Sequence, residues 1–206
     1  MAVHRVRMYV DGFNLYYGIH AAYGRQYLWL DLESLARGVL RPGQRIDRVL
    51  YFTAKIRNDL ASEQRQDIYL QALQERSSRL DIVEGRFQQK RAQCRVCGAS
   101  RVGYEEKETD VSIAVSLVED AANRSYDTAV VVSGDSDLCP AVRAAKRLAP
   151  SRRIVAVFPP RRQSDPLRAV ADGVLHIDRR MLHQSQLPPK VISAGGILLE
   201  RPAYWS

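Results

Sequence analysis

The sequence predicts an α/β fold in which a mostly parallel central sheet is covered by helices on both faces. Apolar segments of strand length alternate along the chain with longer amphipathic segments, an order typical of strands joined by crossover helices. Several of the short segments are rich in β-branched residues, which favour strands. With 206 residues, 46% of them apolar and 26% charged, the chain is long enough for one domain with its own core.

Strands are predicted at residues 6–10, 48–53, 82–86, 129–133, 154–158 and 174–177. Helices are predicted at 14–22, 31–40, 59–76, 110–123 and 137–148, with a short one at 166–171. Several helical segments begin at or just after Asp or Asn, which helix caps and first turns favour. These elements predict a single domain over residues 1–187.

Two segments depart from this alternation. Residues 88–107 contain Cys and Gly in place of a helical pattern, and we interpret them as a hairpin inserted into one crossover. The tail at 188–206 contains Pro188, Pro189, Gly195, Gly196 and Pro202, and we expect it to be extended and packed on the domain.

Charge and cysteine content bear on partners and compartment. Lys and Arg total 31 against 23 Asp and Glu, and the resulting charge of +8 favours a polyanionic partner such as nucleic acid, although it also serves solubility alone. No run of about 18 apolar residues and no cleavable apolar leader is present, so we expect a cytoplasmic protein without a membrane segment. Three cysteines argue against a secreted disulfide framework.

Two acidic segments follow predicted strands. Asp11 comes directly after an apolar strand, and Asp135 and Asp137 come two residues apart after another, separated from it by Ser133 and Gly134. Open α/β sheets bind ligands at this carboxyl edge. Carboxylates this close repel one another unless a cation lies between them, and oxygen ligands suit Mg²⁺ or Mn²⁺. The alternative is that each Asp only forms a turn or caps a helix.

Asp110 opens a predicted helix and shares one helical face with Ala114, Leu117 and Ala121, so we expect its carboxylate at the top of the buried face. A crossover helix runs antiparallel to the strands it joins, and its first turn therefore lies at the same sheet edge as Asp11 and Asp135. A first-turn Asp favoured by the helix dipole is the alternative. Convergence of the carboxylates on one edge is what this alternative does not explain.

Such a cluster predicts metal-dependent hydrolysis of phosphodiester bonds, because a bound divalent ion activates water and stabilises charge on a phosphate. A polyanionic substrate also needs cations around the acidic site. The candidates are Arg57, Arg86, Lys90, Arg91, Arg95, Arg101 and Lys107, each of which could equally be a solvated surface residue.

The segments Tyr9-Val10-Asp11-Gly12-Phe13-Asn14, Lys107-Glu108-Thr109-Asp110 and Ser133-Gly134-Asp135-Ser136-Asp137 stand in this order along the chain. Together they resemble the NYN family of PIN-like nucleases, especially its LabA-like branch, and the tail ending Arg201-Pro202-Ala203-Tyr204-Trp205 is also similar to tails in that branch. The resemblance implies a Rossmannoid three-layer sandwich with strand order 3-2-1-4-5. It also implies Mg²⁺ or Mn²⁺ at the Asp cluster and hydrolysis of RNA in preference to DNA.

Carried over residue by residue, the resemblance makes Asp11, Asp110 and Asp135 metal ligands and Asp137 a further acid that binds the metal directly or through water. Asn14 and Ser133 would support them. Lys107 would pair with an aspartate or grip a phosphate, and Arg86, Lys90 and Arg91 are candidates for nucleic-acid binding. Glu108 departs from the small residue expected beside Lys107.

Two further groups of side chains have open interpretations. Cys94 and Cys97 have zinc-knuckle spacing but supply half of a four-ligand site, so zinc shared across a homodimer, a reduced loop and a redox pair are all open. The cluster of Tyr16, Tyr17, Tyr23, Tyr27 and Trp29 could stack bases near the site or pack in a core or dimer interface.

Two other functions compete with a nuclease. A phosphatase of the haloacid dehalogenase type would need a proton donor two residues after Asp11, where this chain has Phe13. A regulatory domain that binds nucleic acid without cleaving it, or cleaves only conditionally, is the stronger alternative. The retained acids favour the nuclease.

Overall fold

The computed structural model describes residues 4–57, 59–93 and 100–205. Of residues 86–93 and 100–107 it describes the backbone alone. The strands are β1 His4–Asp11, β2 Gln44–Ala54, β3 Leu80–Gln93, β4 Ser100–Lys107, β5 Thr128–Val132, β6 Arg153–Phe158, β7 Gly173–His176, β8 Lys190–Ile192 and β9 Leu198–Glu200. The α-helices are α1 Gly12–Tyr23, α2 Leu32–Gly38, α3 Leu60–Arg76, α4 Thr109–Ala122, α5 Cys139–Leu148, α6 Asp165–Val170 and α7 Arg179–Gln184. The 3₁₀ helices are η1 Ser136–Leu138 and η2 Ala203–Trp205.

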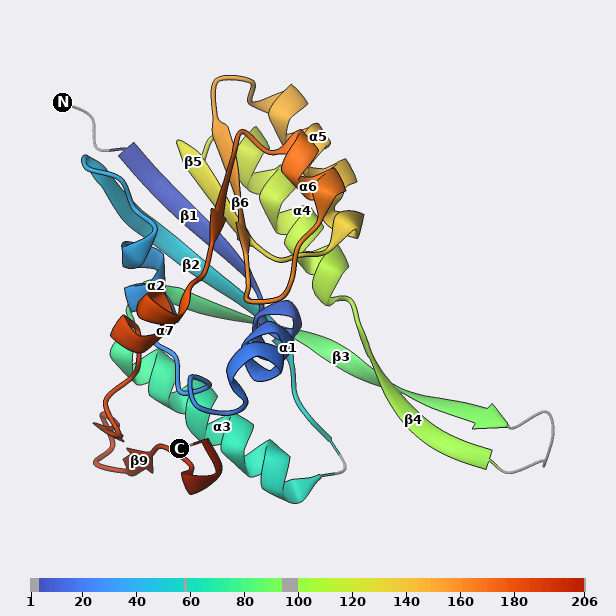
Figure 1. Cartoon of the computed structure of the whole chain (residues 1–206), viewed down its shortest axis with the longest axis vertical. Coiled ribbons are helices and arrows are strands. Elements are labelled where there is room, and N and C mark those ends of the chain that lie inside the picture. The colour runs from blue at the N-terminus through green and yellow to red at the C-terminus, as the bar shows by residue number, and fades with distance from the viewer. Residues whose placement is uncertain (1–3, 58, 94–99, 206) are drawn as a thin grey trace.

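The central sheet has the order β4-β3-β2-β1-β5-β6-β7 (Figure 1). All neighbouring strands pair in parallel except β3 and β4. The α/β class is confirmed, and the predicted order 3-2-1-4-5 corresponds to β3-β2-β1-β5-β6. β7, which lies at the predicted strand 174–177, extends this order as the sixth strand of the parallel series.

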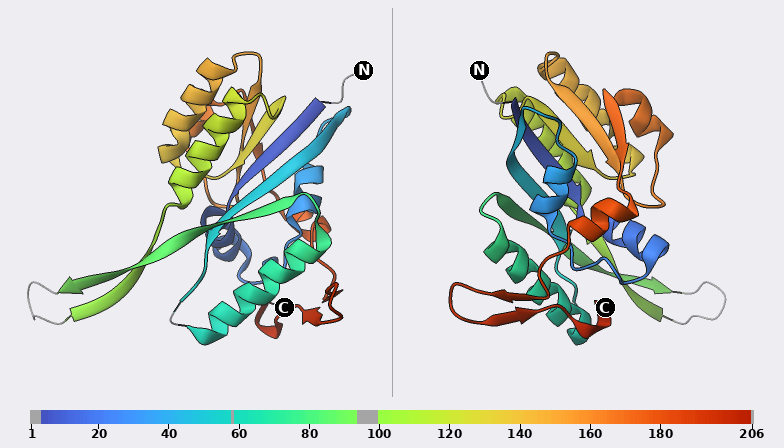
Figure 2. Two further views of the ribbon diagram at one scale, coloured as in Figure 1. Left: turned by 180° about the vertical axis from the view of Figure 1, so that it is seen from behind. Right: turned by 60° about the vertical axis from the view of Figure 1, so that its left-hand side comes forward.

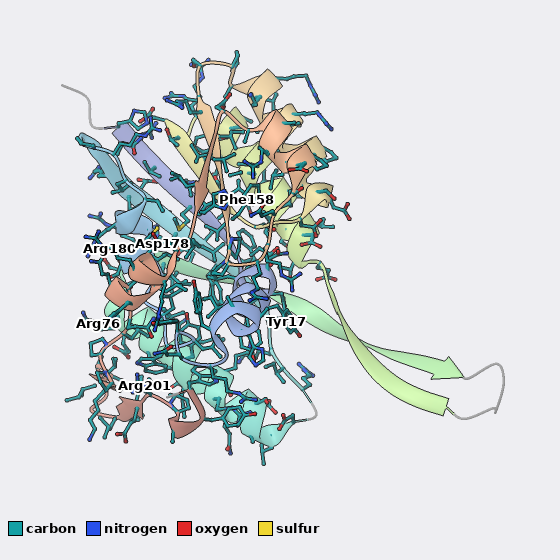
Figure 3. All side chains as sticks on the ribbon, in the orientation of Figure 1. Tyr17, Arg76, Phe158, Asp178, Arg180 and Arg201 are labelled. Atoms are coloured by element: carbon teal, nitrogen blue, oxygen red, sulfur yellow. The ribbon has the colours of Figure 1, made fainter. Side chains whose placement is uncertain are left out.

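Each face of the sheet has its own hydrophobic core. Met8 and Val10 of β1 pack toward the side of α1, α2, α3 and α7, whereas Tyr9 packs toward the side of α4, α5 and α6. Val130, Val131 and Val132 alternate in the same way along β5. Because successive side chains of a strand point to opposite faces, a continuous apolar run is what a strand covered on both sides requires. Helices therefore cover both faces, as Figure 2 and the side chains in Figure 3 show.

The chain leaves β1 in one direction to form β2 and β3, and the remaining parallel strands extend from the other side of β1. The reversal occurs between β1 and β5, whose last register pair joins Val10 to Val132. In open α/β sheets, the crevice outside the carboxyl ends of the strands at such a reversal is the usual ligand site. Asp11 and Ser133 come directly after this pair.

Two strands form an arm that stands away from the helical layers (Figure 1, Figure 2). β3 pairs with β2 as far as Gly85 opposite Ala54, and beyond that point it pairs antiparallel with β4 from Arg86 opposite Lys107 to Gln93 opposite Ser100. This antiparallel ladder occupies the 88–107 segment that departs from the helical pattern. α4 begins directly after the arm returns to the domain.

The C-terminal tail forms a short hairpin of β8 and β9 against α3, where an extended chain was expected. Trp205 is buried beside Trp29 and Tyr69, with ring centroids 6.4 and 5.7 Å away. The indole nitrogen of Trp29 donates a hydrogen bond to the carbonyl of Pro188 at 2.8 Å. The tail is therefore anchored in the core on the α3 side. In the part of the chain that the structure describes, no helix is long and apolar enough to cross a membrane.

Asp127 joins the starts of β1, β5 and β6. Its carboxylate accepts a hydrogen bond from the backbone nitrogen of Arg5 at 2.7 Å and forms an ion pair with Arg152. Burial acts to raise the pKa of Asp127, but the hydrogen bond from Arg5 and the charges of Arg152 and Arg5 outweigh it and place the pKa below its ordinary 3.8. The folded state therefore favours the ionised carboxylate.

We predict that Asp127→Asn lowers the free energy of unfolding by about 1–2 kcal/mol at pH 7. A lowered folded-state pKa gives stability that is present above pH 3.8 and is lost as the pH falls through the folded-state value, so the deficit should shrink below pH 3.8. Urea unfolding at pH 7 and at acidic pH measures this. Asp81→Asn is the control, because Asp81 and Arg48 are 49% and 45% exposed and their pair should contribute little. An equal deficit at both pH values would contradict the prediction.

Candidate functional site

Asp11 is the centre of the candidate site. It ends β1 and caps α1, and its Oδ1 accepts a hydrogen bond from the backbone nitrogen of Asn14 at 2.9 Å. Its Oδ2 accepts from the Asn14 side chain at 2.9 Å and from the Ser133 hydroxyl at 2.8 Å. Asp11 is only 2% exposed, yet both carboxylate oxygens have donors. The cap and the candidate ligand are thus the same residue.

The segment after β5 joins this network from the adjacent strand. The Ser133 hydroxyl accepts a hydrogen bond from the backbone nitrogen of Asp135 at 3.0 Å, and the Asn14 amide oxygen accepts one from the Gly134 nitrogen at 3.2 Å. Asp135 in turn caps η1 by accepting from the Asp137 nitrogen at 2.9 Å. The network therefore connects Asp11, Asn14, Ser133 and Asp135, whereas Asp137 is linked through its backbone and has an exposed side chain.

The environment of Asp11 disfavours its negative charge. Burial is the largest cause of its raised pKa, and the neighbouring charge of Asp135 raises it further. Hydrogen bonds from Asn14 and Ser133 oppose this shift without cancelling it. A cation beside the two carboxylates would stabilise their ionised forms.

Asp110 occupies a different position from the one predicted. The buried line of α4 runs through Thr109, Ile113, Leu117 and Ala121, and Asp110 is half-buried beside it. One residue around a helix is a turn of about 100°, so the first-turn carboxylate lies at the edge of the buried face and not at its top. α4 packs against η1, which keeps its first turn on the side of the sheet edge that carries Asp135.

Glu108 begins α4 in the left-handed conformation with φ of 79°. A side chain with a Cβ is strained in this conformation, which glycine adopts freely. This is a physical reason why a small residue would suit the position better. Lys107, immediately before Glu108, is the last residue of β4, and its backbone lies opposite that of Arg86 in the ladder.

Among the described residues, no three His, Cys, Asp or Glu side chains converge closely enough to hold a metal ion. The structure thus brings Asp11 and Asp135 together without closing a four-aspartate cage. An acidic pair still fits Mg²⁺, because this ion usually keeps several waters and is held by one or two carboxylates plus substrate phosphates. The oxygen-only donor set also suits Mn²⁺.

Three of the remaining candidate cations belong to β3 of the arm. The backbones of Arg86, Lys90 and Arg91 run along β3, and their side chains are outside the described part of the structure. Cys94 and Cys97 fall in the undescribed segment 94–99.

The loop after β6 contributes a cation that sequence reasoning missed. A Cβ added to Gly134 would lie 3.0 Å from the Cβ of Arg162, and one added to Gly18 would lie 3.2 Å from its Cγ. These two contacts place Arg162 between α1 and the loop that carries Asp135. Its side chain is exposed. The Pro159-Pro160-Arg161-Arg162 sequence at the end of a predicted strand was the available signal.

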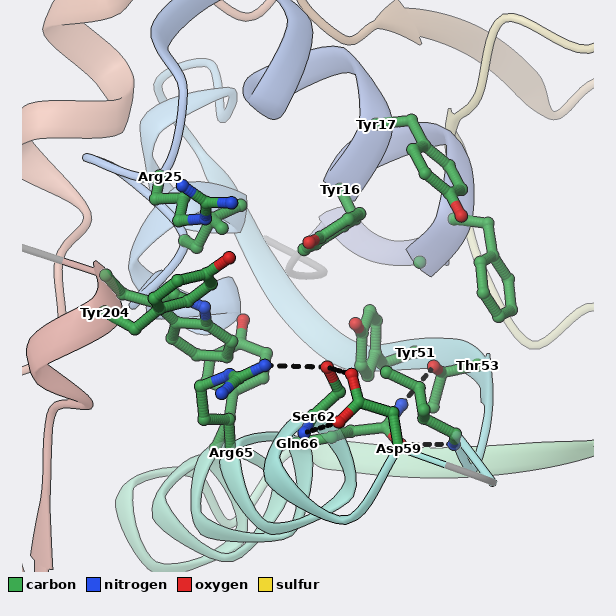
Figure 4. Close-up of a pocket in the computed structure, with 16 residues that line it drawn as sticks. Tyr16, Tyr17, Arg25, Tyr51, Thr53, Asp59, Ser62, Arg65, Gln66 and Tyr204 are labelled. Atoms are coloured by element: carbon green, nitrogen blue, oxygen red, sulfur yellow. Dashed lines mark hydrogen bonds between the residues drawn. The ribbon is translucent and has the colours of Figure 1, made fainter.

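A cavity of about 710 Å³ adjoins the network on the side of β2 and α3 (Figure 4). Gly12, which follows Asp11, lines it together with Tyr16, Tyr17 and residues of α3 and the tail. The aromatic cluster expected after Asn14 is divided between two roles, because Tyr27 and Trp29 are buried in the core while Tyr16 and Tyr17 line the cavity.

Comparison with known proteins places the chain in a family. The sequence model of the NYN domain matches residues 5–178. The chain is 32% identical over 174 residues to 6-hydroxy-3-succinoylpyridine 3-monooxygenase from Pseudomonas putida, a match that covers 68% of this chain and about half, 54%, of that protein.

A crystal structure of a protein of unknown function from Vibrio parahaemolyticus has a similar fold, with a TM-score of 0.58 and 21% identity. The match covers 89% of this chain and 96% of that one. The family match spans both strand-end acidic segments and the first turn of α4. On this basis the chain belongs to the NYN family, within the PIN-like superfamily.

Proposed function

We propose that this protein is a metal-dependent nuclease that hydrolyses phosphodiester bonds, with RNA as its substrate. The observation that carries the proposal is the hydrogen-bonded network of Asp11, Asn14, Ser133 and Asp135 at the reversal between β1 and β5. The NYN family is in general a nuclease family, which supports the same activity. RNA in preference to DNA, a cytoplasmic location and a homodimer remain predictions from the sequence.

The chemistry assigns different roles to the residues of the site. Asp11 and Asp135 would hold Mg²⁺ or Mn²⁺, with Asp110 and Asp137 acting through bound water. The ion would supply an activated water and neutralise charge developing on the phosphate. Asn14 and Ser133 fix the orientation of the Asp11 carboxylate, as partners behind a metal ligand do. Lys107 and the cations of the arm would contact the nucleic-acid backbone.

The second candidate comes from the monooxygenase named among the relatives. The specific observation that favours it is the tyrosine-lined cavity of about 710 Å³ beside Asp11, a volume suited to a single aromatic molecule. The acidic pair favours the nuclease, because carboxylate oxygens are ligands for hard cations and take no part in electron transfer themselves. A regulatory domain that binds RNA without cleaving it is distinguished by the assay below.

We predict that purified protein cleaves labelled single-stranded RNA with Mn²⁺ or Mg²⁺ and not with EDTA. Asp11→Asn and Asp135→Asn should each lower the rate by about 100-fold or more, because each removes a charge that holds the ion. Arg147→Gln, an exposed change on α5, serves as the purification control. Cleavage retained equally in the aspartate variants would indicate a contaminating nuclease, and binding without any cleavage would support the regulatory domain.

Metal binding can be measured without a substrate. We predict that Mn²⁺ raises the melting temperature of the protein, because a ligand that binds only the folded state stabilises it by about 2.7 kcal/mol at 100 times its dissociation constant. The increase should be lost in Asp135→Asn and kept in Asp165→Asn, whose side chain is 95% exposed. The same increase in melting temperature in both variants would show that Asp135 does not hold the metal.

Arg162 is expected to contact phosphate. We predict that Arg162→Gln weakens binding of single-stranded RNA to the Asp11→Asn variant and makes the slope of log affinity against log salt shallower by about 0.7. Fluorescence anisotropy at several salt concentrations measures both quantities, with Arg147→Gln as the charge-matched control. An unchanged slope would show that Arg162 makes no phosphate contact.

A further inference from the structure

The cavity beside Asp11 opens to the surface and has an unusual lining. It lies between α1, the end of β2, α3 and the C-terminal tail (Figure 4). Its volume of about 710 Å³ lies in the range of small-molecule sites. Three tyrosines that line it, Tyr16, Tyr17 and Tyr204, are 40%, 51% and 51% exposed. Exposed rings gathered in one hollow indicate a surface kept for a ligand.

Tyr204 is held in the cavity by two cations. The guanidinium carbon of Arg25 lies 3.9 Å and that of Arg65 lies 4.5 Å from the centre of the Tyr204 ring. Figure 4 shows the two groups on opposite sides of this ring, with Tyr16 projecting into the same space. Burial raises the pKa of Tyr16, and the positive charges of Arg25 and Arg65 act against this rise. The cavity therefore combines aromatic rings with positive charge.

The cavity lies beside the acidic pair. Gly12 lines it and is bonded to Asp11, and burial, with a further contribution from the Asp11 charge, raises the pKa of Tyr51, another lining residue, to about 12. A Cβ at Gly12 would lie 2.6 Å from the Phe52 carbonyl oxygen, so α1 begins in close contact with β2 at this wall of the cavity. In a nucleotide, one sugar joins the base to its phosphate. A phosphate at the acidic pair would thus place a neighbouring base in the cavity.

We propose that this cavity binds a nucleobase of the substrate strand next to the scissile phosphate, with Tyr16 as a stacking wall and the Arg25–Tyr204–Arg65 stack as its cationic wall. The inference rests on the proposed function for its substrate class and adds a subsite to it. Aromatic rings stack on every base, and arginines beside them attract the strand.

Two polar side chains that line the cavity, Gln66 and Ser62, already have partners within the protein. Gln66 Oε1 accepts from the Ile56 nitrogen at 2.8 Å, and its Nε2 donates to the Ala54 carbonyl at 3.0 Å. Ser62 bridges Asp59 and Arg65 by donating to the first and accepting from the second. Stacking therefore dominates over hydrogen bonding to base edges, and the site accepts purines and pyrimidines with similar affinity.

The test is a tryptophan fluorescence titration in EDTA, since Trp205 lines the cavity and Trp29 lies beside it. Adenosine and cytidine 5′-monophosphates should bind at least about fivefold more tightly than ribose 5-phosphate, which lacks the base. Tyr16→Leu should remove this difference while keeping apolar bulk in the cavity. Arg65→Gln should weaken all three ligands, and Arg147→Gln should change none.

A melting curve for each variant separates loss of binding from loss of folding, and Tyr17→Leu tests a second lining ring if Tyr16→Leu unfolds the protein. Equal affinity for ribose 5-phosphate and the nucleotides would overturn the proposal, as would a hydroxylated pyridine that binds where nucleotides do not. A short RNA should displace the bound mononucleotide, and failure to displace it would overturn the assignment to a strand.

Because EDTA prevents metal-dependent cleavage, the two proposals fail separately. Nucleotide binding in this cavity without cleavage in Mn²⁺ would refute the nuclease and retain the base site. Cleavage by a protein whose cavity does not bind nucleotides would refute the base site alone.

Discussion

The hydrogen bonds to the buried carboxylate of Asp11 are the constraint on which the site depends. Removing this charge from water is unfavourable, and three donors from Asn14 and Ser133 offset part of the cost. These donors come from α1 and from the end of β5, so the carboxylate also fixes how the first helix leaves the sheet. Both connections leave little space, which explains two glycines. A Cβ at Gly12 would meet the backbone of β2, and a Cβ at Gly134 would meet Arg162.

These hydrogen bonds offset only part of the cost of burying the Asp11 charge. The pKa of Asp11 remains raised chiefly by burial, and the charge of Asp135 adds to the shift. A protein without a cation at this point keeps two acids in an unfavourable arrangement that an amide or hydroxyl would relieve. Stability given up at one point for binding capacity is common at functional sites. The network contains more hydrogen bonds than the capping of α1 alone requires.

The sequence predicts most of this fold because its signals are local. The apolar runs of β1 and β5 are unbroken since both of their faces are covered, and Asp11 and Asp135 are found because each follows such a run. α7, β8 and β9 are too short to show a period, which is why the tail hairpin was not predicted.

Other features depend on conformation or on distant contacts. α4 begins after the left-handed Glu108, and its buried line runs through Thr109, Ile113, Leu117 and Ala121, so that Asp110 falls beside this line. Arg162 becomes a neighbour of Gly134 only because β6 follows β5 in the sheet, so no local pattern places it at the site. Trp205 is likewise a core residue only through its contacts with Trp29 and Tyr69.

The burial of Trp205 links the tail to the acidic pair. Its indole anchors the end of the chain against Trp29 and Tyr69, and this places the adjacent Tyr204 between Arg25 and Arg65. Tyr69 packs in turn against Tyr51, whose backbone is paired with Val10, the residue before Asp11. A continuous set of packed rings therefore connects the tail with the strand that carries the carboxylate. If the cavity binds a base, the last residues of the chain are part of the binding surface, and shortening the tail changes the site as well as the stability of the fold.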